Sequence, residues 1–149
     1  MAQEVPIARP ACGDVPTLQV SARRLATSHR RVTAEVDPAG GKAVDRMTLT
    51  LPDDLRLAPG VKARNVVARL NRKRIASSRV RLHGIHQIEV RAPREGTLAL
   101  VLDRHAVELS RAGKRRQGDT TTTDLDFNAL LRSDGTQQHV AATATATYR

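Results

Sequence analysis

Short runs in which apolar and polar residues alternate recur along most of this chain, and they constrain its fold more than any other feature. Alternation is the pattern of a β-strand with one buried face, because successive side chains of a strand point to opposite sides. The run Met47–Leu51 is typical, since its methionine and leucines alternate with threonines. Clusters of turn-forming residues, such as Asp37–Gly41, separate the runs at intervals of about 8 to 12 residues. The pattern therefore predicts many short strands joined by turns.

The runs together predict an all-β protein, an antiparallel sandwich or barrel of about eight to ten short strands. A parallel α/β fold is disfavoured because no strand–helix–strand rhythm is present. We expect strands within Leu18–Ala22, Val32–Val36, Val44–Leu51, Leu55–Leu57, Val80–Leu82, Ile88–Val90, Leu98–Leu102, Val107–Leu109, Thr120–Arg132 and Val140–Tyr148. The threonine-rich last strand has high β-propensity but little to bury, which suits an edge position.

One segment, Val61–Leu70, has an ambiguous pattern, because Val66, Val67 and Leu70 lie at helical spacing. A short helical turn near residues 61–65, followed by a strand, suits its position between two turns. The alternative is a longer helix that continues to Ile75.

The most concentrated apolar run is Leu98–Leu102. A strand without polar positions must be covered on both faces, so we expect it to be central. We expect the hairpin over Val80–Val90 on one side of it and the Val107–Leu109 strand on the other.

Composition limits how such a protein can build its core. Hydrophobic residues make up 40% of the 149 residues, but aromatic residues only 1%, namely Phe127 and Tyr148. The core must therefore consist of leucine, valine, isoleucine and alanine, which favours many short strands over a few large anchors. This length suits one domain, and we expect a single β-sandwich domain over residues 16–149.

The first residues differ in pattern from the rest. Residues 1–15 contain Pro6 and Pro10 and show no sustained period, so we expect a flexible leader. Its cysteine, Cys12, is the only one in the chain, which excludes an intramolecular disulfide. Met1–Pro16 lacks the apolar segment of a signal peptide, and no run approaches the ~18 apolar residues of a membrane-spanning helix. We therefore expect no membrane span.

A recurring order of elements carries a family resemblance. Met47–Leu57 (MTLTLPDDLRL) precedes an arginine-rich hairpin over Arg72–Val90 and then Gly96–Leu100, and the chain ends on the threonine-rich Ala141–Tyr148. This order resembles immunoglobulin-like β-sandwich modules in exported proteins of high-GC bacteria, over roughly residues 18–149. The resemblance implies an immunoglobulin-like sandwich that acts as a spacer, stalk or adhesion unit without catalytic residues. The Cys…Trp…Cys signature of antibody domains is absent from the sequence.

The chain is strongly basic, with a formal net charge of +10 that comes mostly from arginine. Such a charge attracts polyanions, although we favour a solvated arginine-rich surface as its explanation. An arginine-rich hairpin and the basic loop Arg111–Asp119 could together contact a nucleic acid or an acidic polysaccharide without sequence specificity. The candidate contacts are Arg69, Arg72, Lys73, Arg74, Arg79, Arg81, Arg91, Arg111, Lys114, Arg115 and Arg116.

The sequence contains no motif for catalysis or for a cofactor. His83 and His86 flank a turn, but the spacing supplies no third metal ligand, so we expect a polar turn. Asp124 and Asp126 are expected on a solvated strand face, and Asp53–Asp54 is typical of a turn. Nucleophile-elbow, P-loop, dinucleotide and zinc-protease motifs are absent from the sequence. We therefore expect neither an enzyme nor a bound cofactor or metal; a hydrolase would need a concave pocket with perturbed titratable groups.

These observations predict a non-catalytic structural or interaction module of a larger exported or cell-surface protein, located outside the cell. Its partner would be a neighbouring domain or another protein, bound through a sheet face or an edge strand. Non-specific polyanion binding is the alternative function. The sequence does not indicate an oligomeric state.

Overall fold

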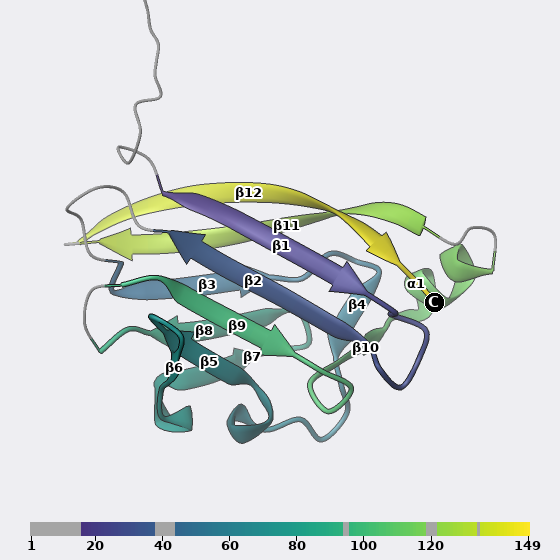
Figure 1. Ribbon diagram of the computed structural model, residues 1–149, viewed down its shortest axis with the longest axis horizontal. Helices are drawn as coiled ribbons and strands as arrows, with labels where there is room; N and C mark the ends of the chain where they lie inside the picture. Colours follow the sequence, from purple (N-terminus) through teal and green to yellow (C-terminus); the bar gives the residue numbers. More distant parts are fainter. Residues whose placement is uncertain (1–15, 38–43, 94–95, 119–121, 134) are drawn as a thin grey trace, which may run out of the picture.

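A computed structural model describes residues 16–37, 44–93, 96–118, 122–133 and 135–149. The expected leader, Cys12 and most of the turn Asp37–Gly41 lie outside these residues. Within them, two five-stranded sheets and a separate two-stranded pair account for the strands (Figure 1).

The first sheet has the order β1-β2-β9-β5-β6. Its strands are β1 (Thr17–Arg23), β2 (Arg31–Asp37), β9 (Leu98–Leu102), β5 (Val67–Leu70) and β6 (Lys73–Arg74). The second sheet has the order β12-β11-β3-β8-β7. Its strands are β12 (Thr136–Thr147), β11 (Thr122–Ser133), β3 (Arg46–Thr50), β8 (Gln87–Arg91) and β7 (Val80–His83). Every strand pair in both sheets is antiparallel.

The remaining elements lie in the connections. Strands β4 (Leu55–Leu57) and β10 (Val107–Leu109) pair with each other. Single 3₁₀ turns form at η1 (Ala63–Asn65) and η2 (Ser77–Arg79), and α1 (Arg111–Gln117) is the only α-helix among the described residues. No described helix has the length and apolar character that crossing a bilayer requires.

The antiparallel β-sandwich expected from the sequence is confirmed. The described residues form twelve strands, because short segments such as β6 add to the predicted set. The short helical turn near residues 61–65 is confirmed as η1 with β5 after it, and the alternative of a helix reaching Ile75 is wrong.

The core lies between the sheets and is aliphatic, as the composition requires. Leu98, Leu100 and Leu102 of β9 are at most 1% exposed and face the second sheet. The predicted neighbours of β9 were wrong, since it pairs with β2 and β5. The hairpin β7–β8 belongs to the other sheet, and β10 pairs with β4.

The expectation that β9 is covered on both faces was also wrong. Ala99 and Val101 on its outer face are half-buried and line an open hollow of ≈ 490 Å³, together with Glu35 and Arg69. The longer side chains beside them partly cover these small side chains. No further sheet or helix is therefore needed on the outer face of β9.

The buried position of Leu100 gives a first prediction. Leu100→Ala should lower the free energy of unfolding by about 2–5 kcal/mol, because it leaves a cavity between the sheets. Urea denaturation measures this change. Ser21→Ala, on the exposed face of β1, is the control and should stay within about 0.5 kcal/mol of the wild type. A comparable small change for Leu100→Ala would contradict the position of the core.

Candidate interaction surfaces

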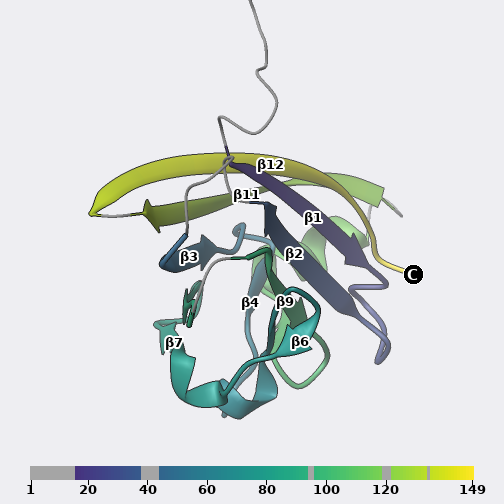
Figure 2. The same ribbon diagram turned by 60° about the vertical axis from the view of Figure 1, so that its left-hand side comes forward.

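The edges of the two sheets are the first candidate surface, since an unpaired edge can accept another strand. In the first sheet the edges are β1 and β6, and in the second they are β12 and β7. Strand β6 has only two residues, both charged, and β7 has four, including Arg81. Strand β1 runs beside β12 in both views of the ribbon (Figures 1 and 2). Short length and charge therefore protect the edges β6 and β7, and the neighbouring strand β12 protects β1.

Strand β12 differs from the other edges. It is twelve residues long, pairs with β11 in an unbroken register, and contains no Asp, Glu, Lys, Arg, Pro or Gly. Its first residues, Thr136 to His139, are exposed. The first part of β12 extends past the start of β1 (Figure 2). Charges, prolines and bulges are the usual means of blocking an edge, and β12 has none of them.

The backbone of β12 offers its free hydrogen-bonding groups in a known direction. The Thr147 carbonyl accepts from the Leu25 N–H at 3.0 Å, so it points away from β11. In an antiparallel strand this direction repeats at every second residue. The N–H and C=O groups of Gln137 and His139 therefore also point away from β11, toward the open side of the edge.

The side chains of β12 follow the predicted alternation. Ala144 and Ala146 are buried, whereas Thr143 and Thr145 face outward. The outward threonine hydroxyls donate to Asp126 at 2.8 Å and to Asp124 at 3.1 Å. These two aspartates thus bind threonines of the neighbouring strand.

A buried carboxylate anchors the C-terminal end of the chain. Asp54, in the turn before β4, is only 5% exposed. Its Oδ2 lies 2.7 Å from Arg116 Nε of α1 and accepts from the Tyr148 hydroxyl at 3.4 Å. Burial raises the pKa of Tyr148 above its ordinary 10.0, and the Asp54 carboxylate raises it further, while Arg116 opposes them. Sequence reasoning treated Asp54 as a turn residue, because nothing local reveals partners 62 and 94 residues away.

The predicted basic loop Arg111–Asp119 was wrong for most of its length, because residues 111–117 form α1. Ser110 caps the helix by accepting from the Gly113 N–H, and its own N–H donates to the Asp54 carbonyl at 2.9 Å. Gly113 is buried against this carbonyl, so a Cβ there would overlap it. The Ser110 cap and the close contact of Gly113 with Asp54 thus stabilise a helix in this basic segment.

The predicted polyanion contacts do not form one surface. On α1, Arg116 is paired with Asp54, whereas the other three predicted residues are exposed: Arg111, Lys114 and Arg115. Lys73 and Arg74 form the short edge β6. Arg69 and Arg72 line the hollow on the first sheet, where Glu35 and Asp37 also lie.

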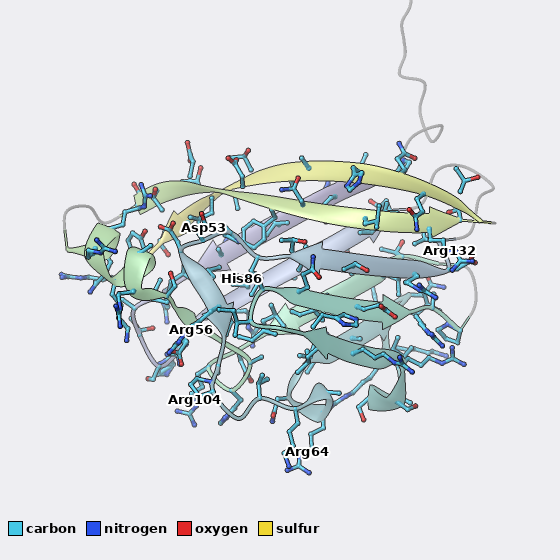
Figure 3. All side chains as sticks on the ribbon, turned by 180° about the vertical axis from the view of Figure 1, so that it is seen from behind. Asp53, Arg56, Arg64, His86, Arg104 and Arg132 are labelled. Carbon is cyan, nitrogen blue, oxygen red and sulfur yellow. The ribbon has the colours of Figure 1, made fainter. Side chains whose placement is uncertain are left out.

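The remaining predicted arginines lie around the hairpin β7–β8. Arg81 stands opposite Glu89 in the register. Arg79 and Arg91 line a hollow of ≈ 320 Å³ on the second sheet, with two arginines that sequence reasoning missed, Arg46 and Arg132. Arg132, Arg46 and Arg91 are direct neighbours across three strands, an arrangement visible only once the register is known (Figure 3 labels Arg132).

Metal-ligating side chains do not gather in the described part of the chain, where no group of three or more His, Cys, Asp or Glu could hold an ion. His83 contacts Glu89, with 3.1 Å between Nε2 and Oε1. His86 lies in the turn between β7 and β8, as predicted.

The docking of α1 gives a second prediction. Gly113→Ala should lower the free energy of unfolding by about 1–3 kcal/mol, because the added Cβ forces the helix away from Asp54. Gly118→Ala is the matched control, since its nearest neighbour is at 3.5 Å and its backbone is helical (φ −72°). Thermal and urea unfolding of both variants measure the difference. Equal stability of the two variants would contradict the docking.

The chain contains a single tyrosine, so its ionisation can be followed by ultraviolet absorbance without interference. The titration midpoint of Tyr148 should lie above pH 10.0, because both burial and Asp54 raise its pKa. A raised pKa stabilises the fold below the unfolded value, and this contribution disappears as pH rises through the folded value. Stability should therefore fall above about pH 10 in the wild type and fall less in Tyr148→Phe. A midpoint at or below that of free tyrosine would refute the buried contact.

Comparison with known proteins identifies the fold and no family. No protein-family model matches the chain, and no curated protein matches its sequence. Among solved structures, BslA, a bacterial hydrophobin, superposes with a TM-score of 0.53 and 12% identity over 87% of this chain and 96% of that one. The full-length major pilin SpaD from Corynebacterium diphtheriae gives a TM-score of 0.53 and 9% identity over 87% of this chain. This chain spans about a third (34%) of the pilin. At these identities the likeness establishes the β-sandwich fold alone.

Proposed function

We propose that this protein is a non-catalytic structural or interaction module of a larger exported or cell-surface assembly. It joins its partner by strand addition, in which an extended segment pairs with the free edge of a sheet. The partner is a second copy of this domain, docked at the N-terminal half of β12.

The uncharged edge of β12 carries this proposal. Edge strands in monomeric proteins are normally blocked, because an open row of N–H and C=O groups invites another chain to pair. The other three edges of this sandwich follow that rule, and Thr136 to His139 does not. A second copy suits the edge because an antiparallel pair related by a two-fold axis uses the same surface twice.

The fold agrees with this role. Two solved structures that share it with TM-scores above 0.5 are named as a hydrophobin and a pilin. The family resemblance in the sequence to modules of exported proteins in high-GC bacteria supports the same class and the same location. A spacer, stalk or adhesion unit needs a stable sandwich and an accessible edge, and it needs no pocket.

Polyanion binding is a second candidate function, and one arrangement favours it. Arg132, Arg46 and Arg91 stand side by side across three strands, with Arg79 beside them around the ≈ 320 Å³ hollow. Like charges opposite each other destabilise a sheet, and guanidinium groups bind phosphate or sulfate well. Glu89 lies 3.8 Å from Arg46 and 3.7 Å from Arg91, which offsets part of this charge.

The edge can be tested with a single charge. Ala141→Lys places an ammonium group on the exposed face of β12, two residues from His139, whose backbone groups face the open edge. In a two-fold pair centred nearby, two such lysines would repel each other. Sedimentation velocity should show concentration-dependent association of the wild type and a monomer for the variant. Hydrogen exchange should show the amides of Gln137 and His139 becoming protected as the wild type associates.

Ala76→Lys is the matched control, because Ala76 is also exposed and lies beside η2, away from β12. It should associate like the wild type. A wild type that stays monomeric at all concentrations, or association that survives Ala141→Lys, would refute the pairing of two β12 edges.

A further inference from the structure

Five arginines gather at one end of the sandwich, and none of them was among the predicted contacts. They come from the adjoining ends of β1 and β2, from the loop between these strands, and from the loop between β9 and β10. We name this group the end cluster, and its members are Arg23, Arg24, Arg30, Arg31 and Arg104. The cluster surrounds a hollow of ≈ 520 Å³ that is also lined by Ser28, His29, Asp103 and His105. Figure 3 shows Arg104 at the end of the molecule opposite Arg132.

The positive charge of the end cluster is not neutralised by the described residues. Among the described residues, Asp103 is the only carboxylate that lines the hollow, and its Oδ1 accepts from the His105 N–H at 2.8 Å. None of the five arginines forms an ion pair within the part of the chain that the structure describes. By contrast, Arg46, Arg91 and Arg116 elsewhere each have a carboxylate within 3.8 Å.

Two features of the end cluster are unfavourable for the fold. Arg23 and Arg31 stand directly opposite each other at the ends of β1 and β2, and like charges in such a pair repel. The next residue, Arg24, has a φ of 53°, a left-handed conformation that is costly for a residue with a side chain. Unfavourable charge pairs and strained backbones that coincide are typical of binding sites.

The surrounding structure holds the cluster in place. Arg30 donates to the carbonyls of Val107, Thr27 and Arg104 at 2.6, 3.0 and 3.2 Å, and so joins the two loops. The Arg24 N–H donates to the Thr147 hydroxyl at 2.9 Å. Arg30 thus holds the two loops together, and Arg104 Nε donates to His105 Nε2 at 3.4 Å. The guanidinium groups of Arg23, Arg24 and Arg31, and the remaining N–H groups of Arg104, stay available around the hollow.

We propose that the end cluster is a binding site for an acidic polysaccharide, whose sulfate or phosphate groups occupy the hollow between the two loops. Guanidinium groups bind such tetrahedral oxyanions through paired, charge-assisted hydrogen bonds. A rigid arrangement of several arginines costs little ordering entropy when the ligand binds.

The geometry favours a polysaccharide over a nucleic acid. Single-stranded nucleic acids gain much of their affinity from bases stacked on aromatic rings, and both aromatic side chains of the chain, Phe127 and Tyr148, are at most 1% exposed. The choice of a polysaccharide also rests on the proposed cell-surface function, where such polymers are the available polyanions.

Binding of a heparin-derived hexasaccharide, measured by titration calorimetry, tests the site. Arg23→Gln with Arg31→Gln should weaken binding by about tenfold or more, since each arginine lost removes charge-assisted hydrogen bonds. The salt dependence of the affinity should also become less steep. The thermal stability of this variant should equal or exceed that of the wild type, because the Arg23–Arg31 repulsion is gone.

Lys62→Gln with Arg64→Gln removes the same charge from two exposed residues at η1 and is the matched control. It should change the affinity by less than about twofold, as expected for loss of long-range attraction alone. Equal losses in both double variants would overturn the site. Equal or tighter binding of a single-stranded oligothymidylate of the same length would overturn the assignment to a polysaccharide.

Arg104→Gln, in the loop between β9 and β10, provides an independent test if the Arg23→Gln, Arg31→Gln variant fails to fold. Its backbone carbonyl remains available to Arg30, so only the guanidinium is lost, and the hexasaccharide affinity should fall. An unchanged affinity would refute the site. Ala141→Lys should bind the hexasaccharide like the wild type, so failure of the edge pairing and failure of this site give different results.

Discussion

The structure depends on the burial of alternate aliphatic side chains between two five-stranded sheets. Sheets that pack face to face lie about 10 Å apart, and this gap must be filled to near-crystalline density. With Phe127 and Tyr148 as the only aromatic residues, leucine, valine and alanine from many strands must fill it. That requirement explains the number of short strands and the length of β11 and β12, which contribute Leu125, Phe127 and Ala144 to the core.

Apolar packing alone does not determine the position of the C-terminal segment, which is fixed by polar contacts. The Leu25 and Ala26 N–H groups donate to the carbonyls of Thr147 and Tyr148, which joins the edge of one sheet to the edge of the other. Asp54 then holds Tyr148 and Arg116 at the same end. A buried ion pair adds little net stability over apolar packing, but losing one partner is costly because a charge stays buried. The network therefore determines the position of α1 and the C-terminus more than it strengthens the core.

The sequence predicted what is local and missed what depends on distant parts of the chain. Alternation placed the strands correctly because the period of two is a property of each strand alone. It could not place Leu98–Leu102 between β2 and β5, since those partners lie more than 27 residues away in the chain. The helix α1 was missed because its position depends on contact with the distant Asp54, although the Ser110 cap is a local signal for its start.

The same limit applies to the candidate sites. Arg79, Arg81 and Arg91 were predicted as contacts of one arginine-rich hairpin. The structure brings Arg79 and Arg91 to one hollow, whereas Arg81 stands opposite Glu89. Their neighbours Arg46 and Arg132 could not be found, because cross-strand register is set by tertiary packing. The end cluster was equally hidden, since Arg104 joins arginines that precede it by more than 70 residues. By contrast, the edge position of β12 was predicted, because an alternation of threonine with alanine offers little to bury.

The two proposed surfaces lie at opposite ends of the sandwich, and this separation has a consequence for assembly. The free half of β12 extends at the end where β1 begins, whereas the end cluster lies where β1 ends and β2 begins (Figure 1). A second copy paired at Thr136 to His139 would therefore leave the end cluster of each copy open to solvent. Such a pair would present two anion sites at its outer ends, and linked sites bind a repeating polymer more tightly than one site does. The arrangement suits a module that joins like modules at one end and binds a surface polymer at the other.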